Sequence, residues 1–148
     1  MVSILNLLNE TNLVNDFLKQ ASPNEIKQYS MRDNCGIAAL DMIEYAKKHD
    51  KLLTRVSGYF IADKIVSSKK DFTNEMRDEL ILDGVNFNDD KLRYEWIMKS
   101  KYKNTMKEIP HYWLIDKQGN IYDPSGYLQF IKRGYATDLN SWRYKQEN

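Results

Sequence analysis

Few residues in this chain could do chemistry at a reactive carbon. Cys35 is the only cysteine among 148 residues, and the two histidines are His49 and His111. A cysteine thiolate attacks carbonyl carbon atoms, a histidine takes and returns the proton, and a carboxylate orients that histidine. These residue types fit nucleophilic catalysis by a thiol, provided that the fold brings one histidine and one carboxylate to Cys35.

Cys35 is predicted to stand at the first position of a helix that runs to about Lys48. The capping residues Asp33 and Asn34 directly precede it, and apolar residues follow at helical spacing, namely Ile37, Leu40, Ile43 and Ala46. Unpaired N–H groups and the positive end of the helix dipole lower the pKa of a thiol there. Gly36 leaves room for a substrate backbone. The other interpretation is that Cys35 is a small core residue, as free cysteines commonly are.

His111 is the histidine available as a base for this thiol. His49 lies at the far end of the same expected helix, roughly 20 Å from Cys35. We therefore expect His49 to be a solvated residue at the helix C-terminus, where a basic side chain is favourable.

His111 begins a hairpin pattern in which Asp123 is the better-placed carboxylate. Lys117-Gln118-Gly119 separates two strand-like segments and suits a three-residue loop with its glycine in the left-handed conformation. That register pairs Trp113 with Asp123 and puts both on the face of His111, whereas Asp116 points away. Trp113 either screens the histidine from water or is a core residue.

Composition narrows the classes of partner. Lys plus Arg number 22 and Asp plus Glu 21, so the net charge of +1 gives no field that attracts nucleic acid or a membrane surface. One cysteine cannot form an internal disulfide and fits a reducing compartment. The first residues make a poor signal peptide, and no apolar run approaches about 18 residues. We predict a soluble, cytoplasmic protein without a cofactor.

A metal site of Cys35, His111 and an aspartate is a remote alternative, since no metal-binding spacing supports it.

The remaining chain is predicted to be mostly helical. Helices are expected over 3–20, closed by Pro23, over 71–83, ended by Gly84, and from about 90 to 102 after the capping residues Asn88 and Asp89. The last of these would bury Leu92, Trp96 and Ile97. Within the mixed stretch 52–68, residues 55–60 fit a strand or a bend, and residues 61–66 fit a strand or a short helix. Residues 124–148 fit a turn followed by a short helical or irregular tail.

Two stretches resemble known families. The order Cys35, His111, Asp123 resembles the papain-like cysteine hydrolases, in which the nucleophile opens a helix and the histidine and acid follow on a sheet. Residues 28–40 are similar to the bacteriocin-leader peptidase domain of ABC transporters, which implies that Gln28 donates to the oxyanion hole. Gln28 stands seven residues before the cysteine rather than six, so Asn34 is a second candidate donor. Residues 111–130 resemble transglutaminase-like and NlpC-type hydrolases.

The resemblance implies one papain-like α+β domain over residues 1–148, with a helical lobe that carries Cys35 packed on a small antiparallel sheet. It implies a thiol hydrolase, a peptidase, amidase or deamidase, acting on a protein, peptide or amide substrate through a thioester. A transglutaminase-like acyl transferase is the alternative within this class. The alternative outside it is a non-catalytic binding or inhibitor protein that uses exposed aromatic residues, namely Tyr127, Tyr135 and Trp142. If the chain is virus-encoded, its compartment is the host cytoplasm.

Overall fold

The chain forms a mixed α+β structure around an antiparallel sheet. It was analysed as a computed structural model that describes residues 13–62, 74–103, 107–136 and 138–147. After a helix at 13–20, the elements in order are α2 (Pro23–Tyr29), α3 (Cys35–Lys47), β1 (Thr54–Ala62), α4 (Asn74–Leu82), α5 (Asp90–Lys99), β2 (Lys107–Ile115), β3 (Ile121–Tyr122), the π-helical turn η2 (Tyr127–Ile131), the 3-10 turn η3 (Ser141–Arg143) and β4 (Tyr144–Gln146).

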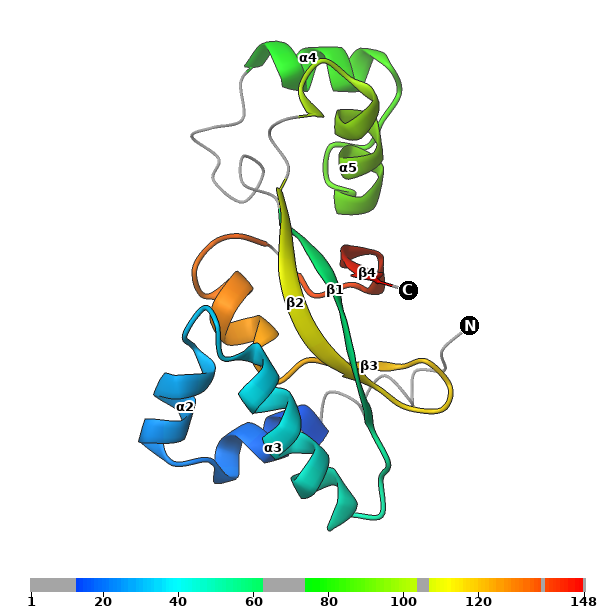
Figure 1. The fold of residues 1–148 in the computed structure, drawn as a ribbon. Helices are drawn as coiled ribbons and strands as arrows, with labels where there is room; N and C mark the ends of the chain where they lie inside the picture. The colour runs from blue at the N-terminus through cyan, green and yellow to red at the C-terminus, as the bar shows by residue number, and fades with distance from the viewer. Residues whose placement is uncertain (1–12, 63–73, 104–106, 137, 148) are drawn as a thin grey trace.

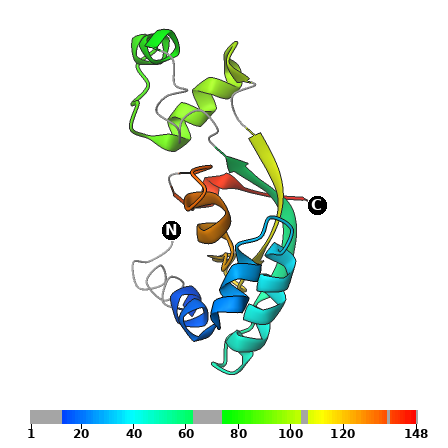
Figure 2. The same cartoon turned by 90° about the vertical axis from the view of Figure 1, so that its left-hand side faces the viewer.

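The sheet is built on the long ribbon of β1 and β2. Its strand order is β3-β2-β1-β4, and the β1–β2 pairing runs from Thr54 opposite Ile115 to Ala62 opposite Lys107. Figures 1 and 2 show the helix at 13–20, α2 and α3 around one end of this ribbon, with α4 and α5 beyond the other end. The long β1–β2 connection therefore carries the α4–α5 pair away from the helices that surround Cys35.

Two apolar clusters hold these layers together. One joins the N-terminal helices to the sheet and includes Phe17, Tyr29, Met42, Leu114 and Tyr122. The other lies between β1 and the C-terminal segment and contains Phe60, Ala62, Phe130 and Ala136. Each cluster removes apolar surface from water, at roughly 25 cal/mol per Å². The C-terminal segment is thereby packed against the middle of the β1–β2 ribbon.

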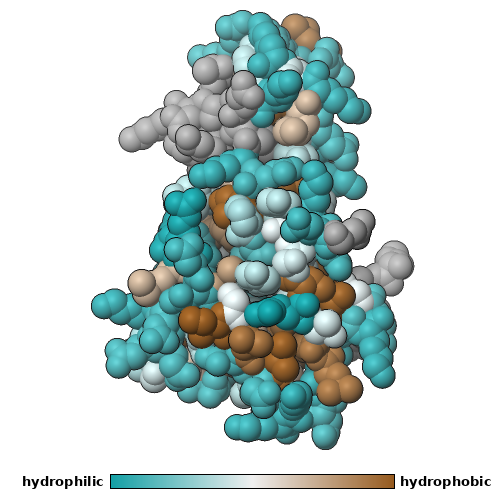
Figure 3. All heavy atoms as spheres, viewed as in Figure 1, coloured by the Kyte–Doolittle hydropathy of each residue, from teal (hydrophilic) through white to brown (hydrophobic). Residues whose placement is uncertain are grey.

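The prediction that α3 begins at Cys35 is confirmed, but the predicted apolar stripe is only partly buried: Ala46 is buried and Ile43 packs on the core, whereas Ile37 and Leu40 do not. Ile37 and Leu40 are 47% and 50% exposed, and the buried residues of α3 are Cys35, Ala38, Ala39, Met42 and Ala46. Small side chains let the helix approach its neighbours closely, which leaves the larger residues outside. Figure 3 shows hydrophobic surface gathered around this helix.

Helix α2 was not predicted, although a capping motif in the sequence marks its start. The Ser22 hydroxyl accepts from the Glu25 N–H and the Glu25 carboxylate accepts from the Ser22 N–H, which is a capping box. Pro23 therefore opens a helix, which its fixed φ favours. Of the helix expected over 3–20, residues 3–12 lie outside the described part; residues 13–20 are helical and bury Phe17.

The other segments agree in part with expectation. Residues 54–62 form the strand β1, while residues 63–68 and the first three residues of the helix expected over 71–83 lie outside the described residues. Asp89 caps α5 by accepting from the Leu92 N–H at 3.0 Å, yet the Leu92 side chain is 43% exposed, so its predicted burial is wrong. Across the described ranges, no helix has both the length and the apolar character needed to cross a bilayer.

Candidate active site

The β2–β3 hairpin has the predicted loop and register. Gly119 has φ +82°, and its N–H donates to the Asp116 carbonyl at 3.1 Å. Leu114 pairs with Tyr122 and Ile115 with Ile121, so the three-residue loop is confirmed. Because side chains alternate along strands, this register puts the residue after β3 on the same face as His111.

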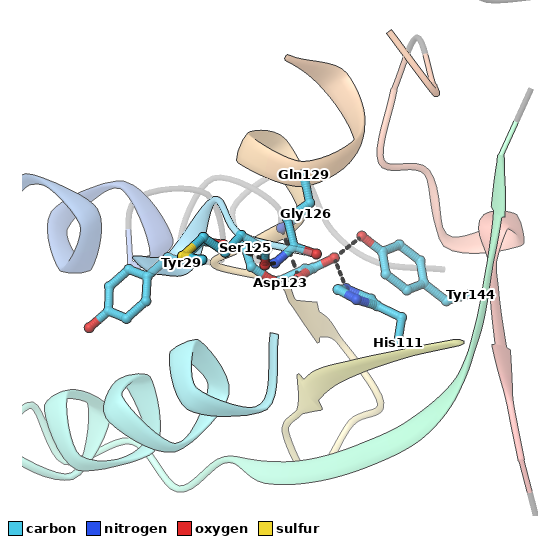
Figure 4. Close-up of polar contacts among 8 residues, drawn as sticks. Tyr29, His111, Asp123, Ser125, Gly126, Gln129 and Tyr144 are labelled. Atoms are coloured by element: carbon cyan, nitrogen blue, oxygen red, sulfur yellow. Dashed lines mark hydrogen bonds and ion pairs between the residues drawn. The ribbon is translucent and has the colours of Figure 1, made fainter. Parts of the chain in front are cut away.

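His111 and Asp123 meet on that face. The Nε2 atom of His111 lies 2.8 Å from Oδ2 of Asp123, and their side chains are 1% and 3% exposed (Figure 4). The carboxylate fixes Nε2 as the protonated nitrogen, so Nδ1 is the nitrogen left for chemistry. Asp123 is thus placed to orient His111, as the hairpin argument predicts.

The backbone turn after β3 holds the Asp123 carboxylate. Its Oδ1 accepts from the Gly126 N–H at 3.0 Å and from the Ser125 hydroxyl at 3.4 Å. Its Oδ2 accepts from the Tyr144 hydroxyl at 2.8 Å, in addition to His111. Four donors on one buried carboxylate stabilise its charge and leave it one orientation.

Asp116 points away from this site, as predicted. It accepts from the N–H groups of Gln118 and Asn120 at 2.9 and 3.0 Å and from the Tyr122 hydroxyl at 2.9 Å. The Asp116 carboxylate therefore closes the hairpin loop.

Cys35 lies beside His111 at the buried start of α3. Burial raises the pKa of the Cys35 thiol, but the His111 imidazole and the Tyr112 backbone N–H lower it further, so the pKa lies below its ordinary value. Burial lowers the pKa of His111, whereas the charge and hydrogen bond of Asp123, helped by Cys35, raise it to about 9. The buried Nδ1 of His111 has no hydrogen-bond partner among the described residues. Each of the two side chains thus favours the charged form of the other, and a protonated His111 would present its unpaired Nδ1–H next to Cys35.

The structure places the two candidate oxyanion donors differently. Gln28 is exposed at the end of α2, and its carbonyl accepts from the Asn34 side-chain amide at 3.0 Å. Asn34 is half-buried next to Cys35 and keeps a second amide N–H. The first bond of the helix runs from the Ala38 N–H to the Asn34 carbonyl, so the N–H of Cys35 has no helical partner. Asn34 and the Cys35 N–H are the better-placed donors.

The two residues expected to line a substrate cleft are also placed differently. Beside Gly36, a Cβ atom would meet the Tyr112 ring at 3.6 Å, which is ordinary contact, and Gly36 is half-buried next to Cys35. Trp113 is 2% exposed, and its ring stacks on His111 with centroids 6.1 Å apart. Trp113 is therefore a core residue that shields His111, and a substrate could not reach its ring.

Two residues that hold the site were missed in the sequence. The buried Gln129 donates its side-chain amide to the carbonyls of Tyr29 and Met31, both at 2.9 Å. Tyr144, on β4, donates to Asp123 as described above. Both contacts join distant parts of the chain, and no local pattern marks either residue.

The second histidine, His49, lies away from this site, at the other end of α3. His49 is exposed and packs on the Tyr45 ring, with centroids 4.6 Å apart, as expected for the end of α3. In the part of the chain that the structure describes, no set of three or more His, Cys, Asp or Glu side chains is placed to hold a metal ion.

Comparisons with protein-family models, with curated proteins and with solved structures found no match.

Proposed function

We propose that this protein is a thiol hydrolase that cleaves a peptide or amide bond with Cys35 as nucleophile, His111 as acid and base, and Asp123 as the orienting group. The observation that carries the proposal is the buried His111–Asp123 pair at 2.8 Å, whose second ring nitrogen is unpaired in the described structure and lies beside the Cys35 thiol. A papain-like fold is part of the same proposal.

The first half of the reaction forms a thioester. The Cys35 sulfur attacks the carbonyl carbon of the substrate, and the carbonyl oxygen takes the negative charge. The Cys35 N–H and the free amide N–H of Asn34 stabilise that oxygen, and one such donor is typically worth about 100- to 1,000-fold in rate. The Nδ1–H of His111 then protonates the leaving nitrogen, and the C–N bond breaks.

The second half releases the product. Neutral His111 takes a proton from water at Nδ1, the hydroxide attacks the thioester carbon, and the C–S bond breaks to return the thiolate and the imidazolium. Asp123 remains ionised and stabilises the imidazolium in both halves. If an amine replaced water, the same intermediate would give the transglutaminase-like acyl transfer.

Alkylation of Cys35 by iodoacetamide, measured against pH, tests the nucleophile and its base. A thiolate–imidazolium pair predicts alkylation that begins well below the free thiol pKa of about 8.5 and is about tenfold faster than a free cysteine at pH 7. His111→Ala should abolish the advantage at neutral pH, and Asp123→Asn should reduce it. His49→Ala and Asp116→Asn are matched controls outside the site and should alkylate like the wild type.

The opposite outcome has a defined meaning. An inert Cys35, or one indifferent to His111→Ala, would refute the proposal and favour the non-catalytic binding protein. Tyr127 and Tyr135, which are 52% and 40% exposed, would then be the surface residues to test for partner contacts. A reactive Cys35 would justify a screen of peptide and amide substrates, with added amine to separate hydrolysis from acyl transfer.

A further inference from the structure

Tyr144 and His111 share one oxygen of the candidate triad. Both donate to Oδ2 of Asp123, and both distances are 2.8 Å. Figure 4 shows the Asp123 carboxylate between the two side chains. Tyr144 comes from β4, whose pairing with Gly58 and its neighbours on β1 fixes the ring at this position. Nothing in the mechanism above uses this hydroxyl.

The other oxygen keeps the carboxylate in place without Tyr144. Oδ1 accepts from Gly126 and Ser125, and Gly126 packs so closely that a Cβ atom there would lie 2.2 Å from Oδ2. Loss of the Tyr144 hydroxyl would therefore change the charge available at Oδ2 more than the position of the carboxylate.

The two donors are coupled through this shared charge. When His111 is protonated, its positive charge neutralises part of the carboxylate, and Tyr144 gains less from its bond. When His111 is neutral, the full charge is available to Tyr144 and the bond is stronger. The Tyr144 bond thus favours neutral His111, and linkage makes the effect reciprocal.

We infer that Tyr144 is a positioning residue of the candidate triad, acting through Asp123 to limit how strongly His111 holds its proton. This inference rests on the proposed function, because it matters for a histidine that must return its proton to a leaving group. A histidine that bound its proton too tightly would be a poor acid in that step.

The groups around this network are few among the described residues. His111 faces Asp123, the Cys35 thiol and the Tyr144 hydroxyl. The charges of Arg143 and Asp138 also act on the Tyr144 hydroxyl, and these two residues form an ion pair with each other at 2.9 Å. Burial and the charge of Asp123 raise the pKa of Tyr144 well above its ordinary range, so the hydroxyl keeps its proton while His111 titrates.

The test is an NMR titration of His111 in a Cys35→Ala background, with and without Tyr144→Phe. The chain has two histidines, so exposed His49 serves as an internal reference. We expect Tyr144→Phe to raise the pKa of His111 by about 0.5 to 1 unit, because His111 is then the one remaining donor to Oδ2 of Asp123. Phenylalanine keeps the ring contacts. Tyr122→Phe is the matched control, since it removes a tyrosine–aspartate bond at Asp116 in the same sheet, and it should leave His111 unchanged.

A pKa of His111 that stays constant or falls in Tyr144→Phe would overturn the inference. If that variant does not fold, the reciprocal measurement decides: in the Cys35→Ala background, the ring-carbon signal of labelled Tyr144 should shift as His111 titrates, because protonation of His111 weakens the Tyr144 bond. A Tyr144 signal that does not change across the His111 titration would also overturn the inference. Because Cys35 is absent from this background, an inert thiol in the alkylation experiment refutes the proposed function without altering the titration.

Discussion

Gly126 gives the most direct test of how the Asp123 carboxylate is held. A Cβ atom at this position would lie 2.2 Å from Oδ2 and 2.6 Å from Cγ of Asp123, far inside contact distance. The backbone of Gly126 has φ −60° and ψ −46°, which any residue adopts without strain. Gly126→Ala therefore acts through this collision alone.

The size of the effect follows from the bonds that the collision breaks. The carboxylate must turn or shift, and its Oδ2 then loses the donors His111 and Tyr144. A hydrogen bond to a charged group contributes about 1.5–3 kcal/mol, and water does not easily replace donors at a buried carboxylate. Replacing glycine by alanine also stabilises the folded protein by about 0.5–1 kcal/mol, because the unfolded chain then has less conformational entropy to lose. We expect the free energy of unfolding to fall by about 2–5 kcal/mol, a large share of the total for a domain of this size.

Denaturant unfolding followed by tryptophan fluorescence measures this loss, and the His111 titration reports the site directly. Gly36→Ala is the control for stability. A Cβ atom at Gly36 meets nothing closer than 3.6 Å, so this helical position should be neutral or gain up to about 1 kcal/mol. A Gly126→Ala variant with wild-type stability and an unchanged His111 titration would refute the described carboxylate geometry.

Three further predictions follow from the same contacts. In Cys35→Ala the pKa of His111 stays above its unfolded value of about 6.5, so the stabilisation from protonated His111 is present below that pH and is lost as pH rises. The free energy of unfolding should therefore fall by about 1–2 kcal/mol between pH 6 and pH 9, and a free energy of unfolding that does not change with pH would contradict this prediction. Gln129→Leu leaves two carbonyls before α3 without their donor and should cost about 1–3 kcal/mol and slow thiol alkylation, whereas unchanged alkylation would argue against its role. A Cβ atom at Gly58 would lie 2.1 Å from the Lys145 carbonyl, so Gly58→Ala should separate β4 from β1 and lower the unfolding midpoint; wild-type unfolding would show that β4 is not docked there.

The hairpin was predictable because its determinants are local. A three-residue loop that ends in glycine fixes the register, and the alternation of side chains then decides which aspartate faces His111. The start of α3 at Cys35 was also predicted from the residues before it, although the Asn34 side chain makes no capping hydrogen bond and donates to the Gln28 carbonyl instead. Helix α2 could have been found in the same way, because its Ser-Pro-Asn-Glu start is a capping signal within four residues.

The rest of the site depends on contacts that no local pattern encodes. Gln129 bonds to carbonyls about 100 residues earlier in the chain, and Tyr144 reaches Asp123 only because the three-residue strand β4 docks on β1. So short a strand has no measurable periodicity. The buried face of α3 was misjudged for a related reason: which side of a helix is covered depends on its neighbours, and here alanines make the close contact while Ile37 and Leu40 remain outside.

The candidate site is assembled from two parts of the chain, and the hydrogen bonds of Gln129 are among the contacts that join them. The nucleophile lies at the start of α3, whereas the histidine, the carboxylate and Gln129 all lie within residues 111–129. The amide of Gln129 bonds the carbonyls of Tyr29 and Met31, so the same segment that presents Asp123 also fixes the loop that leads into Cys35. These amide hydrogen bonds, together with the packing of α3 on the sheet, therefore help to hold the Cys35 segment next to the His111 segment. Within the described residues Nδ1 of His111 has no hydrogen-bond partner, so the proton that it carries in the proposed reaction is free to move to a leaving group.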